Sequence, residues 1–193
     1  MIYNVTRYID LNNEKFRIKP KPQEDELLSS WLVRVARAHL TLTTSFTNMH
    51  FKEYKNNIIW QRDLDIWCPD KLIDRISFKS GYSEEIIFNM TLRSLEGIIA
   101  DKITGKTFTP NIRALGNYCH IKTCGGLMFC SECLKEDKIP YFRKIWRLKE
   151  HTICKKHNTN LLDRCPKCLT PLTISKSFQE KDFTFCYKCG NKL

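Results

Sequence analysis

Apolar residues recur at helical spacing through the first half of the chain. After two prolines at positions 20 and 22, which disfavour a helix, they line one face of an expected helix: Leu28, Trp31, Leu32, Val35 and Ala36. The acidic run 23–26 suits the start of this helix, and we expect it to end near Leu40. Ser45 is the expected cap of a second, short helix that runs to Met49.

A further helical pattern covers residues 70–93 and is interrupted by Gly81, with Ser83 as a good cap for the part that follows. The expected buried residues are Leu72, Ile73 and Ile76 in the first helix and Ile86, Ile87, Met90 and Leu92 in the second. Helix, turn and helix together resemble a helix-turn-helix unit in spacing. The second helix is a poor reader of a DNA groove, however, because residues 84–92 contain no Lys or Arg.

Four pairs of metal-binding residue types lie in the last third of the chain, each with two residues between its members. The pairs are Cys130/Cys133, Cys154/His157, Cys165/Cys168 and Cys186/Cys189. This spacing lets a tight turn point two ligand atoms at one ion, and two pairs complete the tetrahedral site of structural zinc. We therefore expect two Zn²⁺ ions. The expected fold is an N-terminal helical, helix-turn-helix-like region in residues 1–110, followed by two zinc-finger or zinc-ribbon modules in residues 111–193.

The four pairs can combine in two ways. Sequential pairing places one site in residues 130–157 and an all-cysteine site in residues 165–189. Interleaved pairing would join the first pair to the third, but the seven residues between His157 and Cys165 are many for such a cross-brace, so we favour sequential pairing. Iron or an iron–sulfur cluster is the alternative metal at the all-cysteine site. Disulfides would need an oxidising compartment, and residues 1–20 show no signal-peptide core.

Positive charge is concentrated in the second half of the chain. Residues 1–110 hold 16 Lys/Arg against 14 Asp/Glu, whereas residues 111–193 hold 16 against 7. A basic domain with metal-fixed turns suits nucleic acid, although solubility or an acidic protein partner would explain the same charge. The residues expected to contact phosphate are Arg143, Lys144, Arg147, Arg164 and Lys167, the first three of which interleave with aromatic residues.

The sequence offers little support for an enzyme. It contains no P-loop, no dinucleotide fingerprint and no paired acidic motif of a two-metal nuclease. Both expected zinc sites use four protein ligands and leave no open position for catalysis. Cys68, Cys119 and Cys124 remain as core or surface thiols, and Cys119 is a poor nucleophile for its neighbour His120 because adjacent side chains seldom face each other. No apolar run reaches the length of a membrane helix.

Two segments together resemble the TniQ family. The first runs from Pro20 to Ala36 and contains the sequence Ser-Ser-Trp-Leu. The second begins with Cys130-Ser-Glu-Cys, continues with a Pro-Tyr pair and a tryptophan, and ends with Cys-Pro-Lys-Cys at Cys168. The cysteine pairs alone would be unspecific. The two segments occur in the family's order, however, and together they cover most of the chain.

This resemblance implies an accessory protein of DNA transposition. Similar proteins choose or hand over the insertion site and work with an AAA+ ATPase of the TnsC type, which then recruits the transposase. In CRISPR-associated transposons they link an RNA-guided effector, with its guide RNA, to that ATPase. The sequence ends at Leu193, so by this resemblance it is expected to lack the long C-terminal extension with which TnsD-type members read an attachment sequence.

An adaptor that acts on a DNA-bound complex in the prokaryotic cytoplasm, at the nucleoid, is therefore the expected function. Two alternatives stay open. One is a stand-alone zinc-ribbon and helix-turn-helix regulator that binds a specific DNA sequence. The other is an interaction module whose basic surface meets an acidic protein, which would show no salt-dependent affinity for DNA.

Overall fold

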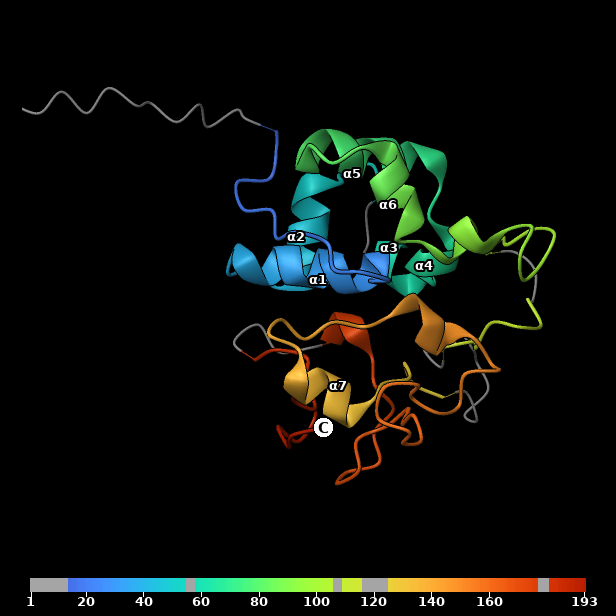
Figure 1. The fold of residues 1–193 in the computed structure, drawn as a ribbon. Helices are drawn as coiled ribbons and strands as arrows, with labels where there is room; N and C mark the ends of the chain where they lie inside the picture. Colours follow the sequence, from blue (N-terminus) through green and yellow to red (C-terminus); the bar gives the residue numbers. More distant parts are fainter. Residues whose placement is uncertain (1–13, 55–57, 106–108, 116–124, 177–180) are drawn as a thin grey trace, which may run out of the picture.

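The computed structural model describes residues 14–54, 58–105, 109–115, 125–176 and 181–193. Its α-helices are α1 (Leu28–Ala38), α2 (Thr43–His50), α3 (Ile58–Gln61), α4 (Leu64–Trp67), α5 (Asp70–Ser80), α6 (Glu84–Asn89) and α7 (Ser131–Glu136). Short 3₁₀ helices are η1 (Leu92–Leu95), η3 (Lys144–Arg147) and η4 (Ile174–Lys176). Within these described ranges, extended backbone pairs through isolated bridges and forms no strand. Figure 1 shows α1 to α6 gathered in one half and α7 in the other.

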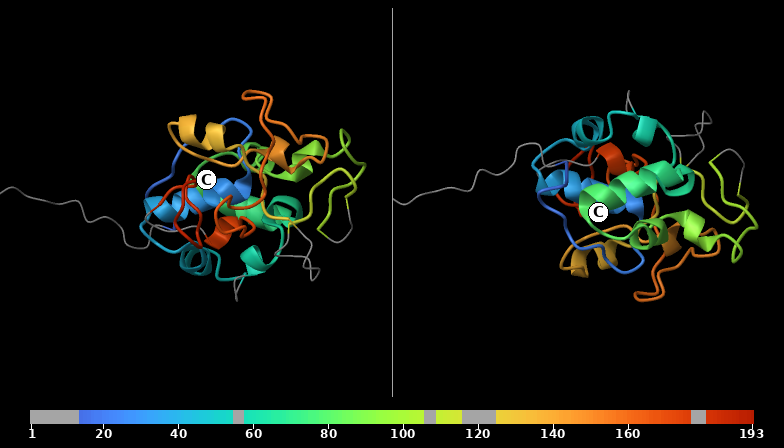
Figure 2. Two further views of the ribbon diagram at one scale, coloured as in Figure 1. Left: turned by 90° about the horizontal axis from the view of Figure 1, so that it is seen from below. Right: turned by 90° about the horizontal axis from the view of Figure 1, so that it is seen from above.

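Helix α1 lies at the centre of the molecule. It contacts α2 and α4 in the helical half and η4 near the C-terminus, and the views in Figures 1 and 2 place it between α5 and the C-terminal segment. All residues from Leu28 to Ala36 are buried, including three polar ones. The sequence predicted one buried face. The observed helix is covered on every side because the metal-binding half packs on the face that the other helices leave open.

The three buried polar residues of α1, Ser29, Ser30 and Arg34, have partners inside the protein, as buried polar groups require. Ser29 donates hydrogen bonds to Asp65 from its backbone nitrogen at 2.8 Å and from its hydroxyl at 2.7 Å. Arg34 lies 2.5 Å from Glu26 in an ion pair whose two side chains are 6% and 0% exposed. Burial raises the pKa of the Glu26 carboxyl, and the Arg34 guanidinium opposes that rise.

The starts of the first two helices differ from the prediction. We expected the acidic run 23–26 to suit the start of α1, but Glu26 lies before the helix and is buried against Arg34. Its carboxylate is held by an internal partner rather than by the helix N-terminus. Helix α2 begins at Thr43, so Ser45 lies within the helix and does not cap it.

Helices α5 and α6 form the expected helix, turn and helix. Gly81, with φ of 74°, ends α5, and Ser83 accepts a hydrogen bond from the Ile86 nitrogen at 3.3 Å, which caps α6. Leu72, Ile73 and Ile76 are buried as predicted. The prediction for Ile86 was wrong, since its side chain is 41% exposed. Helix α6 has six residues and begins with two glutamates, so it offers no positive charge to a DNA groove.

One hydrophobic core joins the helical half to the metal-binding half. The backbone nitrogen of Leu27 donates to the carbonyl of Phe142 at 2.9 Å, and the Phe142 nitrogen donates to the Ser30 hydroxyl at 3.0 Å. The guanidinium of Arg37 lies 4.1 Å from the centre of the Phe183 ring. The division at residue 110 stays a prediction, and any such domains would share this core.

Candidate metal centres

The structure gathers the eight predicted ligands into two clusters, in the sequential pairing. Site 1 consists of Cys130, Cys133, Cys154 and His157, and site 2 consists of Cys165, Cys168, Cys186 and Cys189. Within each cluster all four ligand atoms lie within 4.8 Å of one another. Interleaved pairing is inconsistent with this arrangement, because the first pair faces the second and the third pair faces the fourth.

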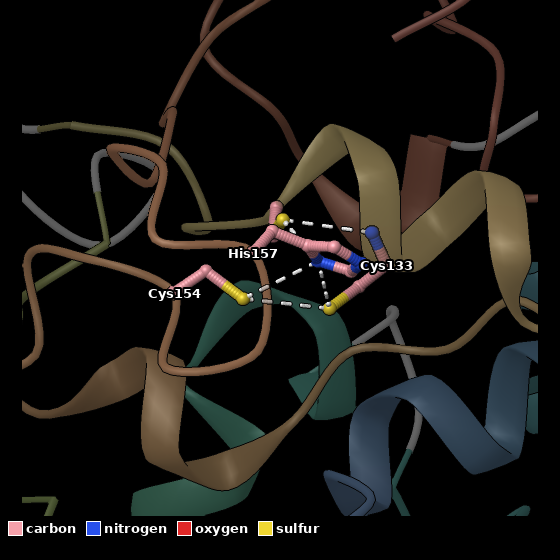
Figure 3. A group of neighbouring side chains, drawn as sticks. Cys133, Cys154 and His157 are labelled. Atoms are coloured by element: carbon pink, nitrogen blue, oxygen red, sulfur yellow. Dashed lines mark hydrogen bonds between the residues drawn. The ribbon is translucent and has the colours of Figure 1, made fainter.

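The ligand atoms of site 1 stand at the corners of a tetrahedron of the size that zinc requires. The Nδ1 atom of His157 lies 3.4, 3.3 and 3.6 Å from the sulfurs of Cys130, Cys133 and Cys154, and the last two sulfurs are 3.6 Å apart. Figure 3 shows the Cys133, Cys154 and His157 side chains converging on one point. Tetrahedral Zn²⁺ would set such atoms about 3.6 to 3.8 Å apart, so the residues fit the ion.

Site 2 has the same dimensions. The sulfurs of Cys165 and Cys189 are 3.7 Å apart, and those of Cys168 and Cys186 are 3.6 Å apart. A disulfide would bring two sulfurs to about 2.05 Å, and every cysteine in the described ranges is free. The two sites differ in solvent access, because Cys189 is exposed whereas all three cysteines of site 1 are buried.

Three of the four ligand pairs share one backbone turn. In each, the residue after the second ligand has a positive φ, and its N–H donates to the carbonyl of the first ligand. These residues are Asn158, Leu169 and Gly190, with φ of 52°, 54° and 68° and hydrogen bonds of 2.7, 2.9 and 2.9 Å. An antiparallel bridge closes each turn at its base. In each of these three pairs, the turn therefore directs both ligands to the same side.

The remaining pair, Cys130 and Cys133, belongs to helix α7. Cys130 is the N-cap residue, and its sulfur accepts a hydrogen bond from the Cys133 nitrogen at 3.5 Å. The same helix supplies a residue that the sequence analysis missed. Glu136 lies 3.0 Å from Nε2 of His157, so it orients the ring and leaves Nδ1 free to face the sulfurs.

The other cysteines take no part in these clusters. Cys68 is buried in the helical half, and burial raises the pKa of its thiol. It therefore behaves as a small core residue. Cys119, Cys124 and His120 lie outside the described residues.

The structure contradicts the prediction that Arg147 contacts phosphate. Its side chain is 0% exposed and forms ion pairs with Asp63 at 2.5 Å and Asp65 at 3.4 Å. An arginine in this position cannot reach nucleic acid without leaving the core. Burial and the neighbouring Asp63 raise the pKa of the Asp65 carboxyl to about 6, while the Arg147 guanidinium opposes that rise.

Arg143 and Lys144 are partly buried and already have protein partners. The Arg143 guanidinium lies 2.7 Å from Asp137 and packs on the rings of Tyr141 and Trp146, 4.2 and 4.8 Å from their centres. Lys144 donates to the Ser94 hydroxyl at 3.3 Å and to the carbonyl of Asn89. Both residues thus help to hold the fold, which sequence reasoning did not foresee.

The two basic residues expected in site 2 are at the surface. Arg164 is 45% exposed and forms an ion pair with Asp163 at 2.7 Å, and Lys167 is exposed on the tip of its turn. The shared turn also places a lysine directly before the second ligand in the other two turns, at Lys156 and Lys188, and both are exposed. The recurring Cys-x-Lys-Cys/His pattern was the signal that could have identified them.

The fold and its two clusters define a class of protein: a small helical protein with two candidate structural zinc sites. Among the described residues, no helix has the length and apolar character to span a bilayer. The family model TniQ matches residues 17–161, about three quarters of the sequence. The chain therefore belongs to the TniQ family, whose members act in target selection for DNA transposition as adaptors. No curated protein matches the sequence significantly.

Proposed function

We propose that this protein links a DNA-bound targeting complex to a TnsC-type AAA+ ATPase, which then recruits the transposase. The observation that carries the proposal is the extent of the family match. It runs from before α1 to the end of site 1, and the structure joins these parts through one core. We therefore assign the family's role in target selection to the helical half and site 1 acting together. We further propose that the protein acts in the prokaryotic cytoplasm, at the nucleoid.

Two Zn²⁺ ions are part of this proposal. Zinc, when bound, would cross-link each pair of turns and would do so without an open position for substrate. The three sulfurs and one imidazole of site 1, and the four sulfurs of site 2, suit zinc better than magnesium or calcium, which prefer oxygen. The ions would stabilise a region that has few regular elements of its own.

The nucleic-acid surface in this proposal is smaller than the sequence suggested. It consists of Lys167, Lys188 and Arg164, which lie at or beside the exposed turns of site 2. Arg143, Lys144 and Arg147 are left out because they are at least partly buried and hold partners inside the fold. Arg164 also has a partner, Asp163, but that pair lies at the surface and the Arg164 side chain is 45% exposed. Three exposed cations fit sequence-independent contact with phosphates. They fit an adaptor on DNA that another complex has already selected.

Co-sedimentation tests the proposal. The zinc-loaded protein is mixed with the TnsC-type ATPase from the same transposon, assembled on DNA with ATP. Binding is expected only when ATPase, DNA and nucleotide are all present. Tight binding to one DNA sequence without the ATPase would contradict the adaptor and support a stand-alone regulator. Failure to bind assembled ATPase, in a preparation that holds two zinc ions per chain, would also reject it.

A further inference from the structure

A short basic segment, residues 15–21, lies on the surface of the helical half and leads toward α1 (Figure 1). It contains no acidic residue, and its four cations are all exposed: Lys15, Arg17, Lys19 and Lys21. We call residues 15–21 the basic strip. Residues 1–110 as a whole hold 16 Lys/Arg against 14 Asp/Glu. The strip is therefore a local concentration of charge in a half that is nearly neutral on average.

The start of the strip is fixed to the protein although it forms no helix or strand. The backbone nitrogen of Phe16 donates to the carbonyl of Lys79 in α5 at 2.7 Å. The Phe16 side chain is 3% exposed, and its ring centre lies 5.1 Å from that of Phe46 in α2. Two residues further on, the Ile18 nitrogen donates to Nε2 of His39 at 3.3 Å. The strip is thus held against α2, α5 and the end of α1.

The end of the strip is fixed by two side chains of α1. Nε1 of Trp31 donates to the carbonyl of Pro20 at 2.8 Å, and Nη2 of Arg34 donates to the carbonyl of Lys21 at 3.1 Å. Both bonds use backbone oxygens of the strip. The Lys21 side chain therefore stays exposed while its backbone is held.

The charges of the strip are poorly compensated within the protein. In the part of the chain that the structure describes, Arg17, Lys19 and Lys21 form no ion pair. Glu14, the acidic residue just before the strip, is paired with Arg75 at 3.0 Å. Like charges that are held together repel one another, and a bound polyanion relieves the repulsion. The backbone contacts keep these three cations together, so the strip favours an anionic partner.

We propose that the basic strip is a second nucleic-acid contact, in which Arg17, Lys19 and Lys21 bind the phosphate backbone of a strand. Cations on a fixed backbone lose less conformational freedom on binding than cations on a free tail. The inference rests on the proposed function in so far as the protein works on nucleic acid. It goes beyond that function because the strip belongs to the helical half and not to site 2.

The composition of the strip favours nucleic acid over an acidic protein. Lysine is depleted in protein–protein interfaces, which have an apolar centre, whereas lysine and arginine are the usual partners of phosphate. Within residues 15–21, Ile18 is the one large apolar side chain that is exposed, at 50%. Phosphodiester groups occur in duplex DNA, in single-stranded DNA and in RNA, and the experiment separates these sources.

The test is the salt dependence of binding by the full-length, zinc-loaded protein. Fluorescence anisotropy gives its affinity for a labelled DNA duplex, for one strand of that duplex and for the RNA of the same sequence, over a range of potassium chloride concentrations. The variant Arg17→Gln/Lys19→Gln/Lys21→Gln should reduce the slope of log affinity against log salt. The expected loss is about 0.9 per contact on a duplex and about 0.7 on a single strand. The nucleic acid with the largest loss is the preferred source.

A matched variant controls for net charge. Arg62→Gln/Lys71→Gln/Lys102→Gln removes one arginine and two lysines from exposed positions elsewhere in the helical half, and it should keep the slope of the natural protein. Zinc content and thermal stability should be unchanged in the strip variant, because the substituted side chains are exposed and the strip is held through its backbone and Phe16.

Three results would overturn the proposal. The first is an unchanged slope on all three nucleic acids, and the second is an equal loss in the matched variant, which net charge alone would explain. The third is a strip variant that keeps the slope but loses affinity for a labelled polyglutamate peptide, which would assign the strip to an acidic protein. Each could occur in a protein that still sediments with the ATPase. Conversely, a protein that fails to sediment could still bind DNA through the strip, so the two failures are distinguishable.

Discussion

The guanidinium of Arg147 lies 2.5 Å from the carboxylate of Asp63, and the Arg147 side chain is fully buried. Arg147 belongs to η3 in the metal-binding half, whereas Asp63 lies just before α4 in the helical half. The pair fixes the two halves to each other at the point where Asp65 also receives hydrogen bonds from α1. The angle between the halves is thus set by buried charge as well as by apolar packing.

Replacement of Arg147 by methionine should destabilise the whole protein. It would leave the buried Asp65 and the partly buried Asp63 without their cation, and loss of one partner from a buried ion pair typically costs about 3–5 kcal/mol. Urea unfolding at pH 7.5 measures the loss. Adding Asp65→Asn to Arg147→Met should recover part of it, because the uncompensated charge is reduced. An Arg147→Met protein of normal stability with weaker DNA binding would instead favour a surface role for this residue.

Metal removal should proceed in two steps. Site 2 has an exposed ligand, Cys189, whereas the sulfurs of site 1 are buried, so a chelator should take the zinc of site 2 first. A colorimetric zinc assay should show two ions per chain, released in two phases. Cys165→Ser should hold one ion and lose the ordered structure of residues 165–193. As a control, Cys68→Ala should keep both ions. Release in a single phase would mean that the sites unfold together.

Substitution of Leu169 by glycine should stabilise the second site. Leu169 has a φ of 54° and is 65% exposed, so its side chain gains little from burial. The left-handed conformation costs such a residue about 1–2 kcal/mol, and the greater flexibility of unfolded glycine offsets about half of the gain. We expect about 0.5–1 kcal/mol from thermal unfolding with zinc present. Leu162→Gly, at a position without positive φ, should be destabilising.

Protonation of His50 should weaken the helical half in mild acid. Burial, with smaller effects from Lys79 and His39, lowers the pKa of His50 from 6.5 to about 4. The unfolded chain therefore binds a proton below pH 6.5 while the folded protein does not. The stability contributed by neutral His50 is complete above pH 6.5 and declines as the pH falls toward 4.

The variant His50→Gln isolates this effect. Between pH 7.5 and 5.5 the natural protein should lose about 1 kcal/mol more stability than the variant, allowing for a ring that is only half-buried. Protonation of the zinc ligands affects both proteins equally, so the difference in urea midpoints reports His50 alone. Parallel pH profiles would show that His50 has the same pKa in the folded and the unfolded protein.

The site 2 lysines should determine how DNA binding depends on salt. Each phosphate contact contributes about 0.9 to the slope of log affinity against log salt concentration. Lys167→Gln and Lys188→Gln should each reduce the slope by about that amount on duplex DNA, without a change in zinc content. Lys71→Gln should leave it unchanged. A slope that does not respond to either site 2 variant would place the DNA contact elsewhere on the protein.

Local patterns were enough to find α1, α2, α5 and α6 and the eight candidate ligands, but not the short helices α3, α4 and α7. Leu72, Ile73 and Ile76 follow the helical period because a helix on the surface of a core buries one stripe. The spacing of two residues within each ligand pair reflects the geometry of a single turn. The family resemblance required both segments in order, and the match over residues 17–161 confirms it.

Burial and the choice of charged partners were decided only by the tertiary structure. Arg147 and Lys167 look equally available in the sequence, but one meets an aspartate 84 residues away and the other meets solvent. An ion-pair partner that is distant along the chain cannot be recognised from the local sequence pattern. The same is true of the packing that covers the second side of α1. The sequence by itself therefore determined which residues can bind metal and which can form helices. The folded chain decided which cations remain available to a binding partner. A charge that is removed from water must be paired within the protein, because an unpaired buried charge is energetically costly.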